Sequence, residues 1–202
     1  MEEQLHAEIQ RVLQYYHDEV IPALAAALTI DDAFPEEVLN EIRNAMTHVA
    51  RASCMTDAAL QSRIDEAKAA QRHLKRVVLD CLKVCILALA TRSEAAVKVL
   101  QADIKLPLAT YTRMSDLRRR RKELSAHEGQ NTPDQVIEDM KVLFNDYDLF
   151  YRDLDKEFAG DTVEMRVKGR FWRETRGYLF AFLIGIAASV VAAYVYASFT
   201  GS

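Results

Sequence analysis

Glycine and proline are scarce in this sequence, since its 202 residues include only 6 glycines and 4 prolines. Long runs of β-branched residues between turn residues are also absent, so the sequence gives no signal for a substantial sheet. Alanine, leucine, glutamate, arginine and lysine fill most windows, and this composition is typical of helices. Half of the residues are apolar, which is enough for a core. We therefore predict an all-α protein.

A strong charge of one sign is missing as well. The chain has 26 basic and 30 acidic residues and a formal net charge of −4. This balance excludes a molecule that binds polyanions over its whole surface, so a nucleic-acid role would need a local basic surface.

Cysteine is rare, with Cys54, Cys81 and Cys85 as its three positions. A small, odd number fits a reducing compartment. Cys81 and Cys85 lie one helical turn apart in an apolar run, and no matching pair of cysteine or histidine completes a tetrahedral metal site. We expect these two thiols to be buried and unreactive, and we expect neither a metal ion nor another cofactor.

Apolar residues at helical spacing predict five helices before residue 160. Their expected ranges are 3–28, with a kink or break at Pro22; 35–53; 56–100, where a break near 91–94 is left open; 112–126; and 133–158. The last carries a broad stripe of tyrosine and phenylalanine, which we interpret as core or dimer contact.

A long uncharged run follows, because residues 177–202 contain no charged side chain. At about 1.5 Å per residue, a helix over residues 178–199 is roughly 33 Å long, enough to cross the hydrocarbon core of a bilayer. We predict a transmembrane helix at residues 177–199. A buried central helix of a soluble protein is the alternative.

The charges before this run predict its orientation. Five basic residues precede it closely, namely Arg166, Lys168, Arg170, Arg173 and Arg176. The positive-inside rule therefore predicts a cytoplasmic helical domain at 1–160, a basic juxtamembrane linker at 161–176 and a single-pass anchor in the inner (cytoplasmic) membrane. Residues 1–14 are charged and amphipathic, so we expect no signal peptide.

Residues 41–48, EIRNAMTH, carry the most informative polar pattern. On a helix, Arg43 and His48 lie about 140° apart, bordering an apolar stripe that we expect to comprise Leu39, Ile42, Ala45, Met46 and Val49. A histidine transfers protons at neutral pH, an arginine holds phosphate, and Asn44 can orient either of them. This set suffices for attack of an RNA 2′-hydroxyl on the adjacent phosphate without a metal ion. Two copies related by a two-fold axis can surround a shared cleft.

The six residues Arg43-Asn-Ala-Met-Thr-His48 resemble the R-x4–6-H signature of the HEPN superfamily, in the R-N-x3-H form of its ribonucleases. The likeness covers about residues 1–160. It implies an up-and-down helical bundle that forms a homodimer, or a higher homo-oligomer, along the motif helices. It also implies metal-independent RNA cleavage, as in toxins and antiviral defence effectors. Arg43, Asn44 and His48 would then be catalytic, with Glu41 as an auxiliary residue.

Two further basic segments need interpretation. The run Arg118, Arg119, Arg120, Arg121 and Lys122 is the densest basic cluster outside the predicted membrane flank, and we treat it as a candidate site for RNA phosphates or lipid headgroups. Because the run covers more than one helical turn, part of it must face water. His73, among Arg72, Lys75 and Arg76, has no identifiable partner and is expected at the surface.

Two functions are compatible with this sequence. The first is a membrane-anchored endoribonuclease that acts on RNA through Arg43 and His48. The second is a non-catalytic, tail-anchored helical adaptor or sensor that binds a regulatory or partner protein or a nucleotide. We favour the first because of the R-N-x3-H motif.

Overall fold

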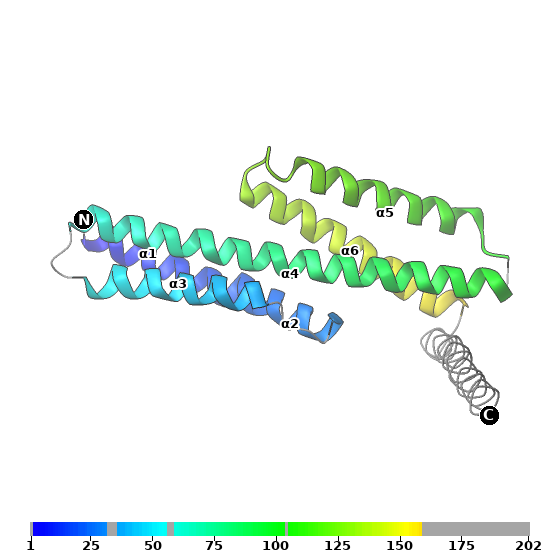
Figure 1. Ribbon diagram of the computed structural model, residues 1–202, viewed down its shortest axis with the longest axis horizontal. Helices are drawn as coiled ribbons and strands as arrows, with labels where there is room; N and C mark the ends of the chain where they lie inside the picture. The colour runs from blue at the N-terminus through cyan, green and yellow to red at the C-terminus, as the bar shows by residue number, and fades with distance from the viewer. Residues whose placement is uncertain (1, 32–35, 56–58, 104, 159–202) are drawn as a thin grey trace, which may run out of the picture. The chain divides into compact units, whose positions relative to one another are not determined.

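The computed structural model describes residues 2–31, 36–55, 59–103 and 105–158, and its elements are helices (Figure 1). They are α1 (Glu2–Tyr15), a π-helical turn η1 (Tyr16–Val20), α2 (Ile21–Asp31), α3 (Glu36–Cys54), α4 (Leu60–Asp103), α5 (Leu108–His127) and α6 (Pro133–Phe158). No strand occurs in the described ranges, and the all-α prediction is confirmed.

The chain divides into two compact units. One consists of Met1–Glu94 with Leu106–Asp153, and the other of Ala95–Lys105 with Leu154–Ser202. The candidate residues of α3, α4 and α5 all belong to the first unit. The predicted domain boundary at residue 160, the linker at 161–176 and the anchor at 177–199 lie outside the described residues. None of the described helices is both long and apolar enough to cross a membrane.

The predicted irregularity near Pro22 is a π-helical turn that precedes the proline. The backbone N–H of Ile21 donates to the carbonyl of Tyr16, five residues earlier. Proline has no N–H to donate, and its ring clashes with the carbonyl four residues earlier in a regular helix. The wider turn lets helical structure continue through residues 16–20 into α2.

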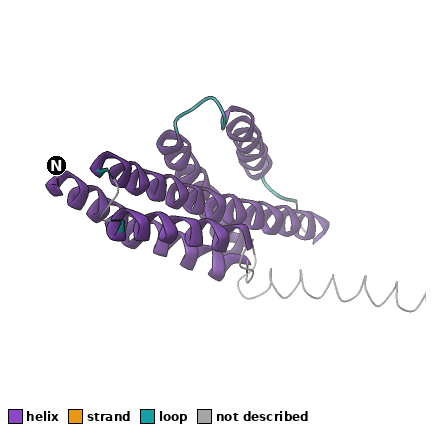
Figure 2. Ribbon diagram, turned by 60° about the vertical axis from the view of Figure 1, so that its left-hand side comes forward, coloured by secondary structure: helices purple, strands orange, loops and turns teal. Residues whose placement is uncertain are grey.

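Helices α1, α3 and the first part of α4 lie side by side (Figures 1 and 2). Buried Leu5, Ala52, Ile64 and Ala67 bring the three helices into one apolar cluster. Since the chain reverses within a few residues between α3 and α4, these two helices run antiparallel. Their hairpin positions most of the candidate site.

The buried line of α3 differs from the predicted stripe. Val38, Ala45 and Ala52 are buried at a spacing of seven residues, whereas Leu39 is 52% exposed. A seven-residue spacing is typical of two long helices packed nearly in line. The stripe was predicted about one residue position away from the true seam, which moves Glu41 and His48 from its flank to positions facing α4.

Helix α4 passes through residues 91–94 without a break. Ser93, which lies where a break was left open, is buried at 1% exposure inside this helix. In the described part of the chain its hydroxyl oxygen is buried and has no hydrogen-bond partner, so Ser93 does not cap a helix. Cys81 and Cys85 are buried as predicted, and burial raises the pKa of the Cys81 thiol to about 12.

Helices α5 and α6 form a second hairpin, joined by residues 128–132 (Figure 1). The aromatic stripe of α6 supplies core side chains, with Tyr147 and Phe150 each 2% exposed. Ion pairs join the hairpin, including Arg113 to Asp153 at 2.7 Å. The predicted core role of this stripe is confirmed for these residues.

Candidate functional site

The same spacing of acid and imidazole occurs on both helices of the first hairpin. Glu41 and His48 are seven residues apart on α3, and Glu66 and His73 are seven residues apart on α4. Because the helices are antiparallel, each glutamate meets the histidine of the other helix. We call these four residues the histidine–glutamate quartet.

The contacts within the quartet are short. His48 Nδ1 lies 2.6 Å from Glu66 Oε2, and His73 Nδ1 lies 2.5 Å from Glu41 Oε2. The two imidazole rings stack, with centroids 5.1 Å apart and an interplanar angle of 18°. All four side chains are 21–26% exposed, so the cluster is half-buried and still open to solvent.

These contacts determine the protonation pattern of the rings. An ionised carboxylate only accepts hydrogen bonds, so Nδ1 of each histidine carries the proton. In the described part of the chain the Nε2 atoms make no hydrogen bond, and neither is among its buried polar atoms without a partner. Each Nε2 is therefore reachable from solvent, as a base when the ring is neutral and as an acid when it is protonated.

Arg43 and Asn44, the other predicted catalytic residues, also lie on α3, with Arg43 about 140° around the helix from His48. Arg43 is exposed, and within the described ranges its side chain makes no ion pair. Asn44 is half-buried, and its amide makes no hydrogen bond in that same part of the chain. Both side chains are thus free to contact a ligand.

Glu41 and His73 have partners that the sequence did not indicate. Glu41, expected as an auxiliary residue, is the partner of His73 and also lies 3.8 Å from Arg76. His73, expected at the surface without a partner, is 21% exposed, and its Nδ1 contacts Glu41. The partner was missed because it is 32 residues earlier in the chain, on a different helix. The repeated E-x6-H spacing is the sequence signal that identifies it.

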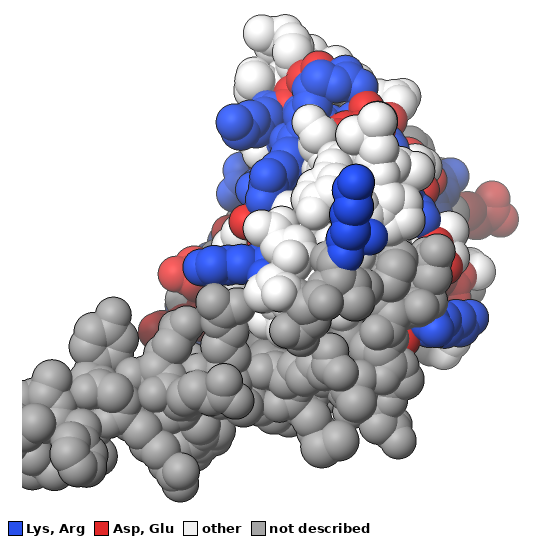
Figure 3. Space-filling model, turned by 90° about the vertical axis from the view of Figure 1, so that its right-hand side faces the viewer, with Lys and Arg blue, Asp and Glu red and all other residues white. Residues whose placement is uncertain are grey.

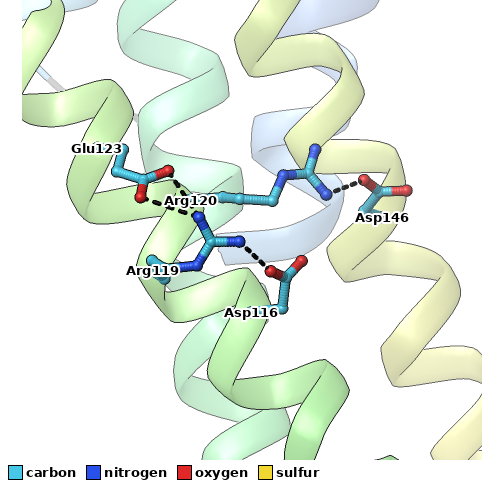
Figure 4. A network of polar contacts seen from close by, with 5 residues as sticks. All are labelled: Asp116, Arg119, Arg120, Glu123 and Asp146. Atoms are coloured by element: carbon cyan, nitrogen blue, oxygen red, sulfur yellow. Dashed lines mark hydrogen bonds and ion pairs between the residues drawn. The ribbon is translucent and has the colours of Figure 1, made fainter.

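The arginine run of α5 is largely paired with carboxylates. Arg118 lies 2.8 Å from Glu94 on α4, and Arg120 lies 2.6 Å from Asp146 on α6. Arg119 bonds to Asp116 and Glu123 of its own helix (Figure 4).

Figure 3 shows basic side chains gathered on the upper part of one face, where α5 lies, with acidic side chains beside several of them. Arg121 and Lys122 make no ion pair within the described residues. The excess positive charge of the run is therefore smaller than its sequence indicates. Binding of RNA or lipid by residues 118–122 stays a prediction.

No group of three or more histidine, cysteine, aspartate or glutamate side chains is arranged to hold a metal ion in the described ranges. The quartet instead offers two oriented imidazoles, and the same helix carries an exposed arginine and an amide, Arg43 and Asn44. Such a set can transfer protons and bind an anion. Comparisons of the chain with protein-family models, with curated proteins and with solved structures give no significant match.

Proposed function

We propose that this chain is a membrane-anchored, metal-independent endoribonuclease of the HEPN type, in which His48 transfers protons and Arg43 stabilises the phosphate. The observation that carries the proposal is the contact of 2.6 Å between His48 Nδ1 and Glu66, in a half-buried but accessible position. A carboxylate on Nδ1 fixes the tautomer and the orientation of the ring. The opposite nitrogen is then prepared for proton transfer.

The reaction begins with neutral His48. Its Nε2 takes the proton of an RNA 2′-hydroxyl, and the 2′-oxygen attacks the adjacent phosphorus. The bond from phosphorus to the 5′-oxygen breaks, and the leaving oxygen takes a proton from protonated His73. The products are a 2′,3′-cyclic phosphate and a 5′-hydroxyl. The stacking of the two rings, with centroids 5.1 Å apart, supports this division of roles.

Arg43 supplies the positive charge that this transition state needs. Its guanidinium is exposed and has no competing carboxylate in the described part of the chain. An arginine binds two phosphate oxygens at once and stabilises charge that develops on them. Since Arg43 and His48 diverge by about 140° on α3, the arginine that meets a given His48 belongs to a second copy of the chain.

The test is RNA cleavage by the full-length chain in detergent solution with EDTA. His48→Ala lowers the cleavage rate by about 10²- to 10⁴-fold, the usual contribution of a general acid or base. His6→Ala, which removes an exposed histidine of α1, serves as the matched control and leaves the rate unchanged. Cleavage that persists in His48→Ala with folding intact would refute the assignment.

A second candidate is the tail-anchored adaptor or sensor, which has its own supporting observation. Each half-buried imidazole already has a carboxylate partner, and these contacts by themselves stabilise α3 against α4. In this function the quartet holds the hairpin together and the surface binds a partner protein. Wild-type protein would then cleave no RNA, and His48→Ala would lower stability while partner capture by a refolded sample is retained.

One variant distinguishes the nuclease from the adaptor. Glu66→Gln keeps a hydrogen-bond acceptor for His48 but removes the negative charge. In the nuclease, this change lowers the cleavage rate, because the imidazole loses the carboxylate that orients it and balances its charge during proton transfer. An adaptor has no cleavage rate to change.

A further inference from the structure

A cavity of about 620 Å³ lies between α4 and the segment that joins α5 to α6. This size falls within the range of small-molecule sites, roughly 300–1,000 Å³. Four basic side chains from successive turns of α4 line it, together with two acidic ones. None of these residues belongs to the quartet, although Arg76 lies 3.8 Å from Glu41 and so adjoins it.

Two ion pairs hold the walls of this cavity together. Lys83 Nζ lies 2.6 Å from Glu128 at the end of α5, and Lys75 Nζ lies 2.6 Å from Asp134 at the start of α6. Both lysines therefore form ion pairs with carboxylates. Their role is to fix the α5–α6 loop against α4 and so to preform the cavity.

The two arginines of the cavity do not form such short ion pairs. Arg72 is exposed and makes no ion pair in the described part of the chain. Arg76 is 66% exposed, and its contact with Glu41 is long for a charged hydrogen bond. The two residues are one helical turn apart, so both guanidinium groups can reach a single anion. Planar guanidinium groups match the geometry of phosphate oxygens.

The other lining groups suit a flat, partly apolar ring. Leu79 of α4 and Pro133 and Val136 of α6 contribute apolar surface, and Asn131 contributes an amide that both donates and accepts. The cavity also contains the carboxyl of Asp80, whose pKa is raised by burial. Cationic groups, apolar surface and one amide together match a nucleotide better than they match a simple anion.

We propose that this cavity binds a nucleotide unit, with its phosphate on Arg72 and Arg76 and its base against Leu79 and Val136. The unit has two sources with the same chemistry, a free mononucleotide or one residue of an RNA strand. The RNA source rests on the proposed nuclease function, because the strand would extend from the quartet past Arg76. A free nucleotide requires no nuclease activity.

The experiment measures binding to the full-length chain in detergent solution, with AMP and adenosine as separate probes. A third probe is a short, fully 2′-O-methylated RNA, which lacks the attacking hydroxyl and therefore cannot be cleaved. AMP is expected to bind at least about tenfold more tightly than adenosine, because adenosine lacks the phosphate. Arg72→Ala weakens AMP binding by at least about tenfold, the loss of one charge-assisted contact.

Two further variants sharpen the test. Asp80→Asn removes a negative charge that lines the cavity and leaves both wall-forming ion pairs in place, so AMP binding tightens a few-fold. Arg11→Ala removes an exposed arginine of α1 that does not line the cavity, and it changes nothing. If Arg72→Ala weakens the RNA probe as well, and AMP displaces that probe, the RNA strand is the source. If only AMP responds to Arg72→Ala, the ligand is the free nucleotide.

Three results would overturn the proposal. They are absence of AMP and RNA binding at millimolar probe, binding that Arg72→Ala leaves intact, and displacement of AMP by an equal concentration of inorganic phosphate. The last result would mean that the base makes no contact. Because all of these readouts are of binding, a chain that binds AMP but cleaves no RNA would remove the nuclease proposal and keep this one.

Discussion

The quartet between α3 and α4 and the arginine run of α5 contain similar charged contacts in different surroundings. The quartet side chains are 21–26% exposed, and in the described ranges their hydrogen bonds and ion pairs join α3 to α4. Arg119, by contrast, is 61% exposed and pairs with two residues of its own helix. Water and salt screen the second kind of contact much more than the first. The four residues of the quartet are therefore expected to contribute more to the free energy of unfolding than the five residues of the arginine run.

The largest effect on stability is expected from Glu66→Ala. The substitution leaves the Nδ1–H of His48 without its acceptor in a half-buried position, and such a loss costs about 1–3 kcal/mol of unfolding free energy. Denaturant unfolding followed by circular dichroism measures it. Asp116→Ala, which removes a partner of Arg119, is the matched control on α5. Equal effects of the two substitutions would erase the distinction between the regions.

A smaller effect is expected for the stacked imidazoles. In a double-mutant cycle of His48→Ala and His73→Ala, we expect a coupling of about 0.5–1.5 kcal/mol, the range of aromatic pairs. The unfolding free energies of the wild type, both single variants and the double variant give this value. Strict additivity would mean that the two rings are merely neighbours, and that the carboxylates alone hold the quartet together.

The smallest effects are expected on α5. Arg120→Ala breaks the pair with Asp146, in which both side chains are partly exposed, and costs about 0.2–1 kcal/mol. Arg119→Ala is expected to change the thermal midpoint by no more than the measurement error, because its partners are local and hydrated. Thermal unfolding at low salt and at 1 M NaCl checks both. A loss for Arg119→Ala larger than that for Arg120→Ala would contradict the ranking by exposure.

Much of the first unit's helical structure could be predicted from sequence, because helical periodicity and proline positions are local signals. Helix α6 begins at Pro133, as expected from the preference of proline for a first turn. The break considered near Ser93 is absent, since tertiary packing overrides the local signal of a serine followed by a glutamate. Leu39 was assigned to the core because an apolar residue at helical spacing looks the same whether or not a neighbour covers it.

The candidate site was predictable only in part. His48 was identified from a motif on one helix, and its surroundings were not, because they depend on how α3 aligns with α4. A contact between residues 41 and 73 has no local signature. The equal spacing of Glu41 to His48 and of Glu66 to His73 does carry the information, provided that the two helices are taken as an antiparallel pair.

The alternation of glutamate and histidine along the α3–α4 contact also restricts how far α3 can slide along α4. In an antiparallel pair of helices, the residue numbers of facing positions have a constant sum. Here that sum is 114, both for residues 41 and 73 and for residues 48 and 66. A slip of seven residues one way sets Glu41 opposite Glu66, and a slip the other way sets it opposite Asp80. Either displacement keeps the alanine and valine seam intact yet places two carboxylates together. Of these three alignments, the observed one alone pairs both glutamates with histidines.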